Sequence, residues 1–130
     1  MLTGRQKPNI LKHDIAIKEI QSFLVANSVN SIYAYNASFD VRCLSELSSF
    51  KWHDIVRIAA YRQHNPAIPE TTECCRTGRI KSGYRVEDIL NMFGECDYHE
   101  VHNALIDAID ELRIMKYLMH PIRNYPVLTV

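Results

Sequence analysis

The stretch Ser31-Ile32-Tyr33-Ala34-Tyr35-Asn36-Ala37-Ser38-Phe39-Asp40 decides the fold, because its residue pattern changes at Asn36. Residues 31–35 are short, aromatic and β-branched, which is typical of a strand buried on at least one face. Asn36 turns the chain. From Asp40 onward, apolar residues recur at helical spacing, namely Cys43, Leu44 and Leu47. We therefore predict a strand, a turn and a helix, with Asp40 at the carboxyl end of the strand, where open α/β sheets bind ligands.

The same kind of pattern predicts the other elements of an α/β fold. Helical spacing indicates three further helices, at about residues 14–27, 86–93 and 102–119. Asn27 is expected to end the first of them in the left-handed conformation. Residues 54–59 favour a second strand, with a helix continuing to Tyr61 as the alternative. Residues 64–83 contain two prolines and two glycines and are predicted to form a loop long enough to be functional.

Composition places the chain among ordinary globular proteins. Its 130 residues suit a single domain, and Lys plus Arg and Asp plus Glu balance at 15 each, so any contact with nucleic acid must be local. Basic residues gather between Arg57 and Arg85, whereas acidic residues dominate from Glu87 to Glu111. The four cysteines show no disulfide framework, and no signal peptide or membrane span is recognisable. We therefore expect a reduced, cytoplasmic protein without a membrane partner.

A second motif, His102-Asn103-Ala104-Leu105-Ile106-Asp107, opens the last predicted helix. Asp107 and Asp40 are candidate metal ligands, because carboxylates suit Mg²⁺ and Mn²⁺. His102 is the candidate general base, since an imidazole titrates near neutral pH and can take a proton from water. Asp110 and Glu111 are interpreted as solvated surface.

Two further interpretations concern binding. Phe39 either stacks on an unpaired base or belongs to the core, and Asn36 is most simply a turn former. The spacing Cys96-x2-His99-x2-His102 is a weak alternative zinc pattern that lacks a fourth ligand.

The two motifs together resemble those of the DnaQ-like (DEDDh) 3′-5′ exonucleases, which include proofreading subunits and RNase T. The matching residues are Asn36-x-x-Phe39-Asp40-x-x-x-Leu44 and His102-x-x-x-x-Asp107. The resemblance implies a ribonuclease H-like fold and a pair of Mg²⁺ or Mn²⁺ ions bound by Asp40 and Asp107, with His102 as the base. It also implies removal of nucleotides from the 3′ end of single-stranded DNA or RNA, with Asn36 and Phe39 contacting the strand.

The chain departs from the family at its beginning. The first family motif, Asp-x-Glu on the first strand, has no counterpart before residue 36, and there is no room for the strands that carry it. We therefore expect a partial exonuclease fold: either the C-terminal part of a longer domain, or a sheet whose open edge pairs with a second copy or another chain. The functional alternatives are an exonuclease-type domain with an incomplete metal site, and a non-catalytic nucleic-acid-binding or protein-interaction module derived from an exonuclease.

Overall fold

The computed structural model describes residues 12–128, and the chain divides into two compact units, residues 1–30 and 31–130. In the first unit, α1 (His13–Ala26) ends as its sequence suggests, because Asn27 Nδ2 donates a hydrogen bond of 2.8 Å to the Phe23 carbonyl. The left-handed residue is Ser28, with φ 55°, rather than Asn27, with φ −100°. The predicted stop is therefore correct and its predicted backbone conformation is wrong.

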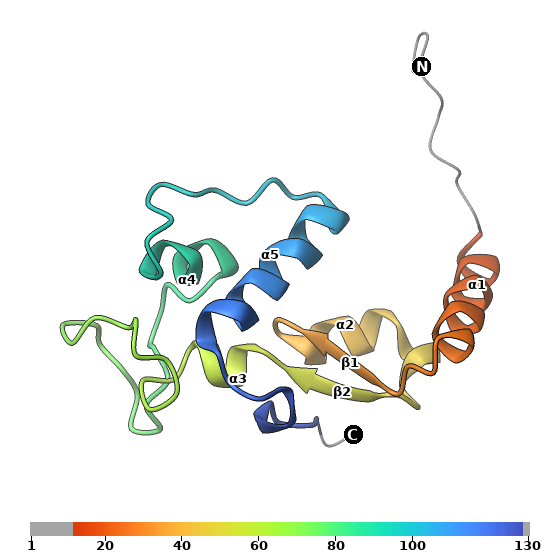
Figure 1. The fold of residues 1–130 in the computed structure, drawn as a ribbon, viewed down its shortest axis with the longest axis horizontal. Helices are drawn as coiled ribbons and strands as arrows, with labels where there is room; N and C mark the ends of the chain where they lie inside the picture. Colours follow the sequence, from red (N-terminus) through yellow and green to blue (C-terminus); the bar gives the residue numbers. More distant parts are fainter. Residues whose placement is uncertain (1–11, 129–130) are drawn as a thin grey trace, which may run out of the picture. The chain divides into compact units, whose positions relative to one another are not determined.

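The second unit contains a small parallel sheet. β1 (Ser31–Ala34) pairs with β2 (Lys51–Asp54), with Ala34 opposite Asp54 (Figure 1). The connection between them is α2 (Ala37–Cys43) followed by the short 3-10 helix η1 (Ser45–Leu47). The mixed α/β class and the strand-turn-helix segment are thus confirmed.

The two outer edges of this sheet differ. Along β2, the C-terminal segment covers the edge, since Leu128 N donates to the Trp52 carbonyl at 2.8 Å and Asp54 N donates to the Pro126 carbonyl at 3.1 Å. Along β1, no strand within residues 12–128 pairs with the outer edge. The sheet is closed on one side and open on the other.

The chain becomes helical directly after β2. The structure has α3 (Val56–Ala59) where the sequence favoured a strand over 54–59, so the helical alternative is the correct one. Asp54 starts this turn, because its Oδ1 accepts the Val56 N–H at 3.1 Å. Ile58 and Ala59 are buried, which explains why this segment is as apolar as a strand.

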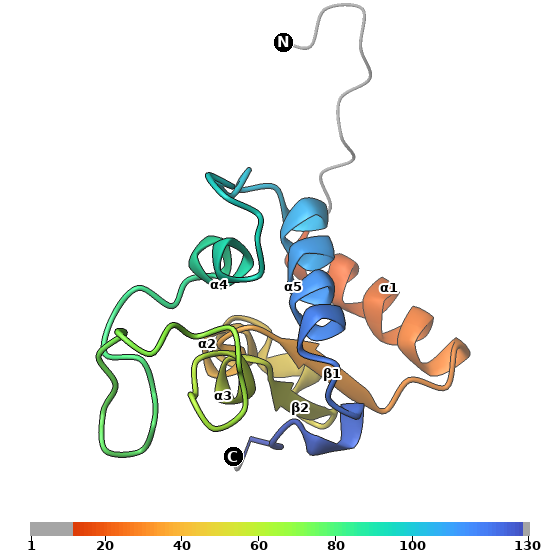
Figure 2. The same cartoon turned by 60° about the vertical axis from the view of Figure 1, so that its left-hand side comes forward.

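Two more helices complete the unit and pack against each other: α4 (Val86–Met92) and α5 (Ala104–Leu118) (Figures 1 and 2). The short 3-10 helix η2 (Ile122–Asn124) follows them. The C-terminal half of α5 enters the core, which includes Ile55, Ile58, Ile80, Ile89, Leu90, Ile114, Leu118 and Tyr125.

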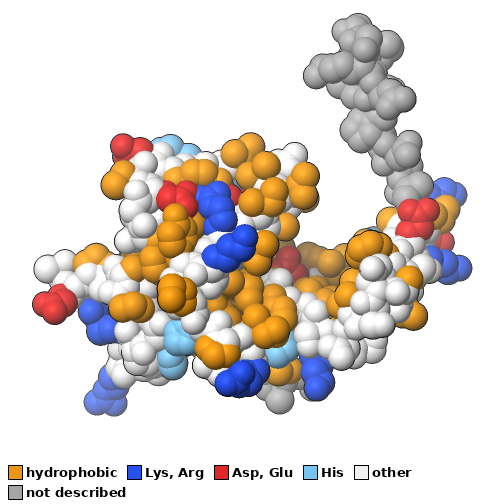
Figure 3. Space-filling model, viewed as in Figure 1, with side chains coloured by type: hydrophobic (Ala, Val, Ile, Leu, Met, Phe, Trp, Pro, Cys, Tyr) orange, Lys and Arg blue, Asp and Glu red, His pale blue; other side chains and the backbone are white. Residues whose placement is uncertain are grey.

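One face of α5 is apolar and exposed. Leu105 is 69% exposed, Ile109 44% and Leu112 50%, and hydrophobic side chains are visible over this helix in Figure 3. α5 has 15 residues, and no helix within residues 12–128 has the length and apolar character needed to cross a bilayer.

Candidate functional site

The turn after β1 lies between carboxylates. Asn36 takes the left-handed conformation with φ 62°, which asparagine tolerates better than most residues. The Tyr35 N–H donates to Glu111 Oε1 at 2.8 Å, and the next N–H, that of Asn36, donates to Asp54 Oδ1 at 3.0 Å. These two hydrogen bonds fix one acid from α5 and one from β2 at the carboxyl end of β1.

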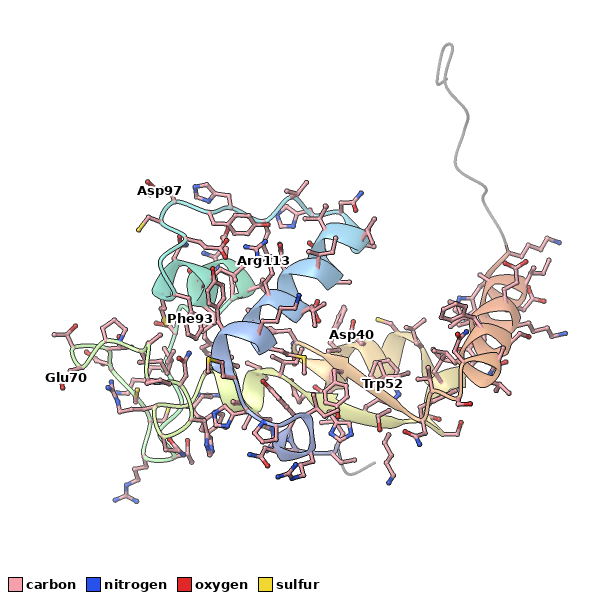
Figure 4. The ribbon with its side chains drawn as sticks, viewed as in Figure 1. Asp40, Trp52, Glu70, Phe93, Asp97 and Arg113 are labelled. Carbon is pink, nitrogen blue, oxygen red and sulfur yellow. The ribbon has the colours of Figure 1, made fainter. Side chains whose placement is uncertain are left out.

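Asp40 lies close to this turn, in α2 (Figure 4). Burial raises the pKa of its carboxyl group, and the negative charge of Asp54 raises it further. Burial also raises the pKa of Asp54, although three backbone N–H groups and the charge of Arg57 oppose the change. Both carboxyl groups are therefore held where negative charge is disfavoured.

Glu111 and Asp107 lie one helical turn apart on α5, so their side chains share a face. The pKa of Glu111 is raised to about 7, first by burial and then by the negative charges of Asp40 and Asp107, against the hydrogen bond from Tyr35. Asp107 Oδ1 is buried and has no hydrogen-bond partner among the described residues. The structure thus brings the two predicted ligands within electrostatic range of Glu111, an acid that the sequence interpretation left on the surface.

Sequence reasoning missed Glu111, although one signal for it was present. The spacing of four residues from Asp107 places both carboxylates on the same helix face, so a role for one implies proximity of the other. Asp54 was placed in a predicted strand and given no role.

These carboxylates do not amount to a metal site by themselves. Within residues 12–128, no three His, Cys, Asp or Glu side chains come close enough together to bind a metal ion. A pair of divalent ions therefore does not fit the donor set of this chain alone. The same finding counts against the alternative zinc site at Cys96, His99 and His102.

His102 precedes the helix that carries Asp107. It is exposed and has φ 60°, a conformation that is uncommon outside glycine, and Asn103 after it caps α5 by accepting the N–H groups of Leu105 and Ile106. The structure gives His102 no contact with Asp40 or Asp107 among the described residues. Its role as a base stays a prediction.

Phe39 does not belong to the core. Its side chain is 54% exposed, and the Arg42 guanidinium lies 5.9 Å from the centre of its ring. This exposure rules out the core interpretation of Phe39. The stacking interpretation stays a prediction, because an exposed ring is accessible to a ligand.

Asp110 is a structural residue, and its interpretation as solvated surface is wrong. It is only 1% exposed, its Oδ1 accepts a hydrogen bond of 2.8 Å from Arg113 Nη1, and the Tyr98 hydroxyl donates to its Oδ2. Arg113 also pairs with Glu95. The partners of this buried acid are thus Tyr98 on the α4–α5 connection and Arg113, three residues later on α5.

Comparisons with protein families, with curated proteins and with solved structures find no match to this chain.

Proposed function

We propose that this chain is an exonuclease-type domain that acts on the 3′ end of single-stranded DNA or RNA. The observation that carries the proposal is that Glu111 lies at the carboxyl end of β1, bound to the Tyr35 N–H, within electrostatic range of Asp40 and Asp107, the second of which has a buried oxygen without a partner among the described residues. A cation-dependent hydrolase gathers negative charge in this way, and the described acids of this chain supply only part of what such a site needs. The motif resemblance gives the class of substrate.

The site needs at least one further carboxylate. We propose that it comes from an added strand that pairs with the open edge of β1. Ile55 N donates to the Ala34 carbonyl, so alternation along a parallel pair turns the main-chain groups of Tyr33 toward the outer edge. A strand added there in parallel would end beside Glu111 and Asp107. The family pattern of Asp-x-Glu would then supply the missing carboxylates.

The apolar surface next to this edge supports a strand as the occupant. A groove of about 320 Å³ lies between β1 and α5, lined by Tyr33, Leu112 and Met115 among others. Leu112 is half exposed, together with Ile109 one turn before it. A strand with alternate apolar side chains would bury this surface while its backbone pairs with β1. Since Asp-x-Glu occurs nowhere in this sequence, the strand comes from a different segment or chain rather than from a second copy of residues 1–130.

The test is complementation with a peptide. A 5′-labelled single strand is incubated with Mn²⁺, the chain, and an extended peptide of alternating apolar residues that carries Asp-x-Glu; a peptide with Asn-x-Gln is the control. We expect stepwise shortening from the 3′ end only with the acidic peptide. The loss on Asp107→Asn should be at least about 100-fold, whereas Asp97→Asn should have no effect. Asp97 is exposed, adopts a left-handed backbone that asparagine tolerates, and lies far from Asp40 (Figure 4).

One result would contradict the added strand, and another would contradict the exonuclease. Shortening by the chain alone at the rate seen with the acidic peptide would show that the site is already complete and that no strand needs to be added. Binding of the acidic peptide, followed by fluorescence anisotropy, without any shortening of a bound strand would favour the non-catalytic binding module.

A further inference from the structure

A cavity of about 790 Å³ lies beside the turn that follows β1. Its walls come from segments far apart in the chain: the turn at Asn36, Arg57 in α3, and Arg79 with residues 81–85 before α4. This volume suits a ligand of nucleotide size. We call it the cationic cavity, after the side chains described next.

Positive charge exceeds negative charge in the walls of the cationic cavity. The charged lining residues are Arg57, Arg79, Lys81, Arg85, Asp54 and Glu100. Lys81 and Arg85 are paired with carboxylates that do not line the cavity. Arg57 and Arg79 have no carboxylate within ion-pair distance among residues 12–128, although the charge of Arg57 acts on Asp54 in the same cavity. Neither guanidinium group is therefore held in a direct ion pair that a ligand would have to break.

Arg79 is also incompletely hydrogen-bonded. Its Nη2 lies 3.5 Å from Cys75 Sγ, and its guanidinium lies 5.6 Å from the centre of the Tyr84 ring. Its Nε is buried and has no acceptor among the described residues. A buried donor without a partner is costly, and an oxygen of a bound anion would remove that cost.

The surrounding loop holds these groups in place. Tyr61 and Arg79 form an antiparallel bridge, and the Tyr35 hydroxyl donates to the Tyr84 carbonyl. Arg62 Nη2 donates to the Thr72 carbonyl at 2.7 Å, and this hydrogen bond links the middle of the loop to its beginning. The last residues of the predicted long loop, Arg79 and residues 81–83, therefore form part of the cavity wall.

We infer that the cationic cavity binds the phosphodiester backbone of a single-stranded nucleic acid, with Arg57 and Arg79 as the phosphate contacts. Guanidinium groups bind phosphate through paired N–H donors, and the Tyr61 side chain, which also lines the cavity, supplies an aromatic ring on which a base can stack. Asn36 and Asp54 line this cavity, whereas Asp40, Asp107 and Glu111 do not. If the 3′ end lies among the carboxylates, a point that rests on the proposed function, the cavity holds the nucleotides that precede the end.

The test measures binding without metal, so that catalysis plays no part. Fluorescent oligo(dT) and oligo(U) of ten nucleotides, and a DNA duplex of the same length, are titrated with the full chain in EDTA. The dissociation constant of each is measured at several NaCl concentrations. We expect the single strands to bind more tightly than the duplex. Arg57→Gln and Arg79→Gln should each weaken single-strand binding about tenfold and reduce the salt slope by about 0.7, the value for one lost phosphate contact.

Two control variants separate this effect from misfolding and from net charge. Arg76→Gln removes one charge from an exposed position of the same loop that does not line the cavity, and it should bind like the wild type. Arg57→Lys keeps the charge, and it should restore the salt slope. Thermal unfolding of every variant shows whether it is folded.

The inference is overturned if the wild type does not bind single strands at low salt, or if folded Arg57→Gln and Arg79→Gln bind like Arg76→Gln. These failures differ from failure of the proposed function. Peptide-dependent shortening that survives both substitutions refutes the cavity alone. Binding that depends on both arginines, without shortening in the complementation assay, supports the cavity and refutes the exonuclease.

Discussion

Replacing Glu111 with glutamine is expected to raise the free energy of unfolding by about 2 kcal/mol at pH 8 and to change it little at pH 5. The pKa of Glu111 is raised from 4.5 to about 7 in the folded chain, first by burial. Between these two values the folded state keeps a proton that the unfolded state has lost, so the stability of the wild type falls as the pH rises. Glutamine has no proton to lose and can still accept the Tyr35 N–H.

Urea denaturation of both proteins at the two pH values measures this difference. Glu70→Gln, at an exposed tip of the long loop (Figure 4), is the matched control and should show no difference between pH 5 and pH 8. A stabilisation by Glu111→Gln that is equal at both pH values would mean that the carboxyl group of Glu111 titrates normally.

Replacing Asp110 with alanine is expected to lower the free energy of unfolding by about 3 kcal/mol. The loss arises because Arg113 Nη1 and the Tyr98 hydroxyl both lose a buried acceptor. Asp107→Ala, one turn earlier on the same helix, should leave the free energy of unfolding unchanged or raise it slightly. Asp107 Oδ1 has no partner among the described residues, and its negative charge repels that of Glu111.

Thermal and urea unfolding of both alanine variants separates a structural carboxylate from a functional one. If Asp107→Ala is as destabilising as Asp110→Ala, then Asp107 is a structural residue too, and its role as a ligand loses support.

The parts of the fold that follow from local signals could be predicted. The strand, the turn at Asn36 and the helix after it depend on neighbouring residues, and so do the ends of α4 and α5, where Gly94 and Met119 take left-handed conformations. The short apolar run at residues 55–58 could not be assigned in the same way. A run of four is compatible with a strand or a helical turn, and the Asx turn at Asp54 decides between them.

The site was predicted only in part for a related physical reason. Asp40 and Asp107 could be predicted because they belong to motifs. Glu111 could not, because its partner is the N–H of Tyr35, 76 residues away. Asp110 likewise depends on Tyr98 in a connection without regular structure. Contacts of this kind are set by packing, and no periodic pattern on α5 distinguishes the acids that face a partner from those that face water.

The grouping of carboxylates at the end of β1 is tested most directly by a pH titration of the Glu111 side-chain carboxyl carbon, followed by NMR. The structure predicts a pKa of about 7 in the wild type, and a lower pKa in Asp40→Asn and in Asp107→Asn, because each substitution removes a negative charge that faces Glu111. A pKa of Glu111 near the ordinary 4.5 in the wild type, unchanged in both variants, would contradict the shared site and with it the half of a nuclease centre that we place there.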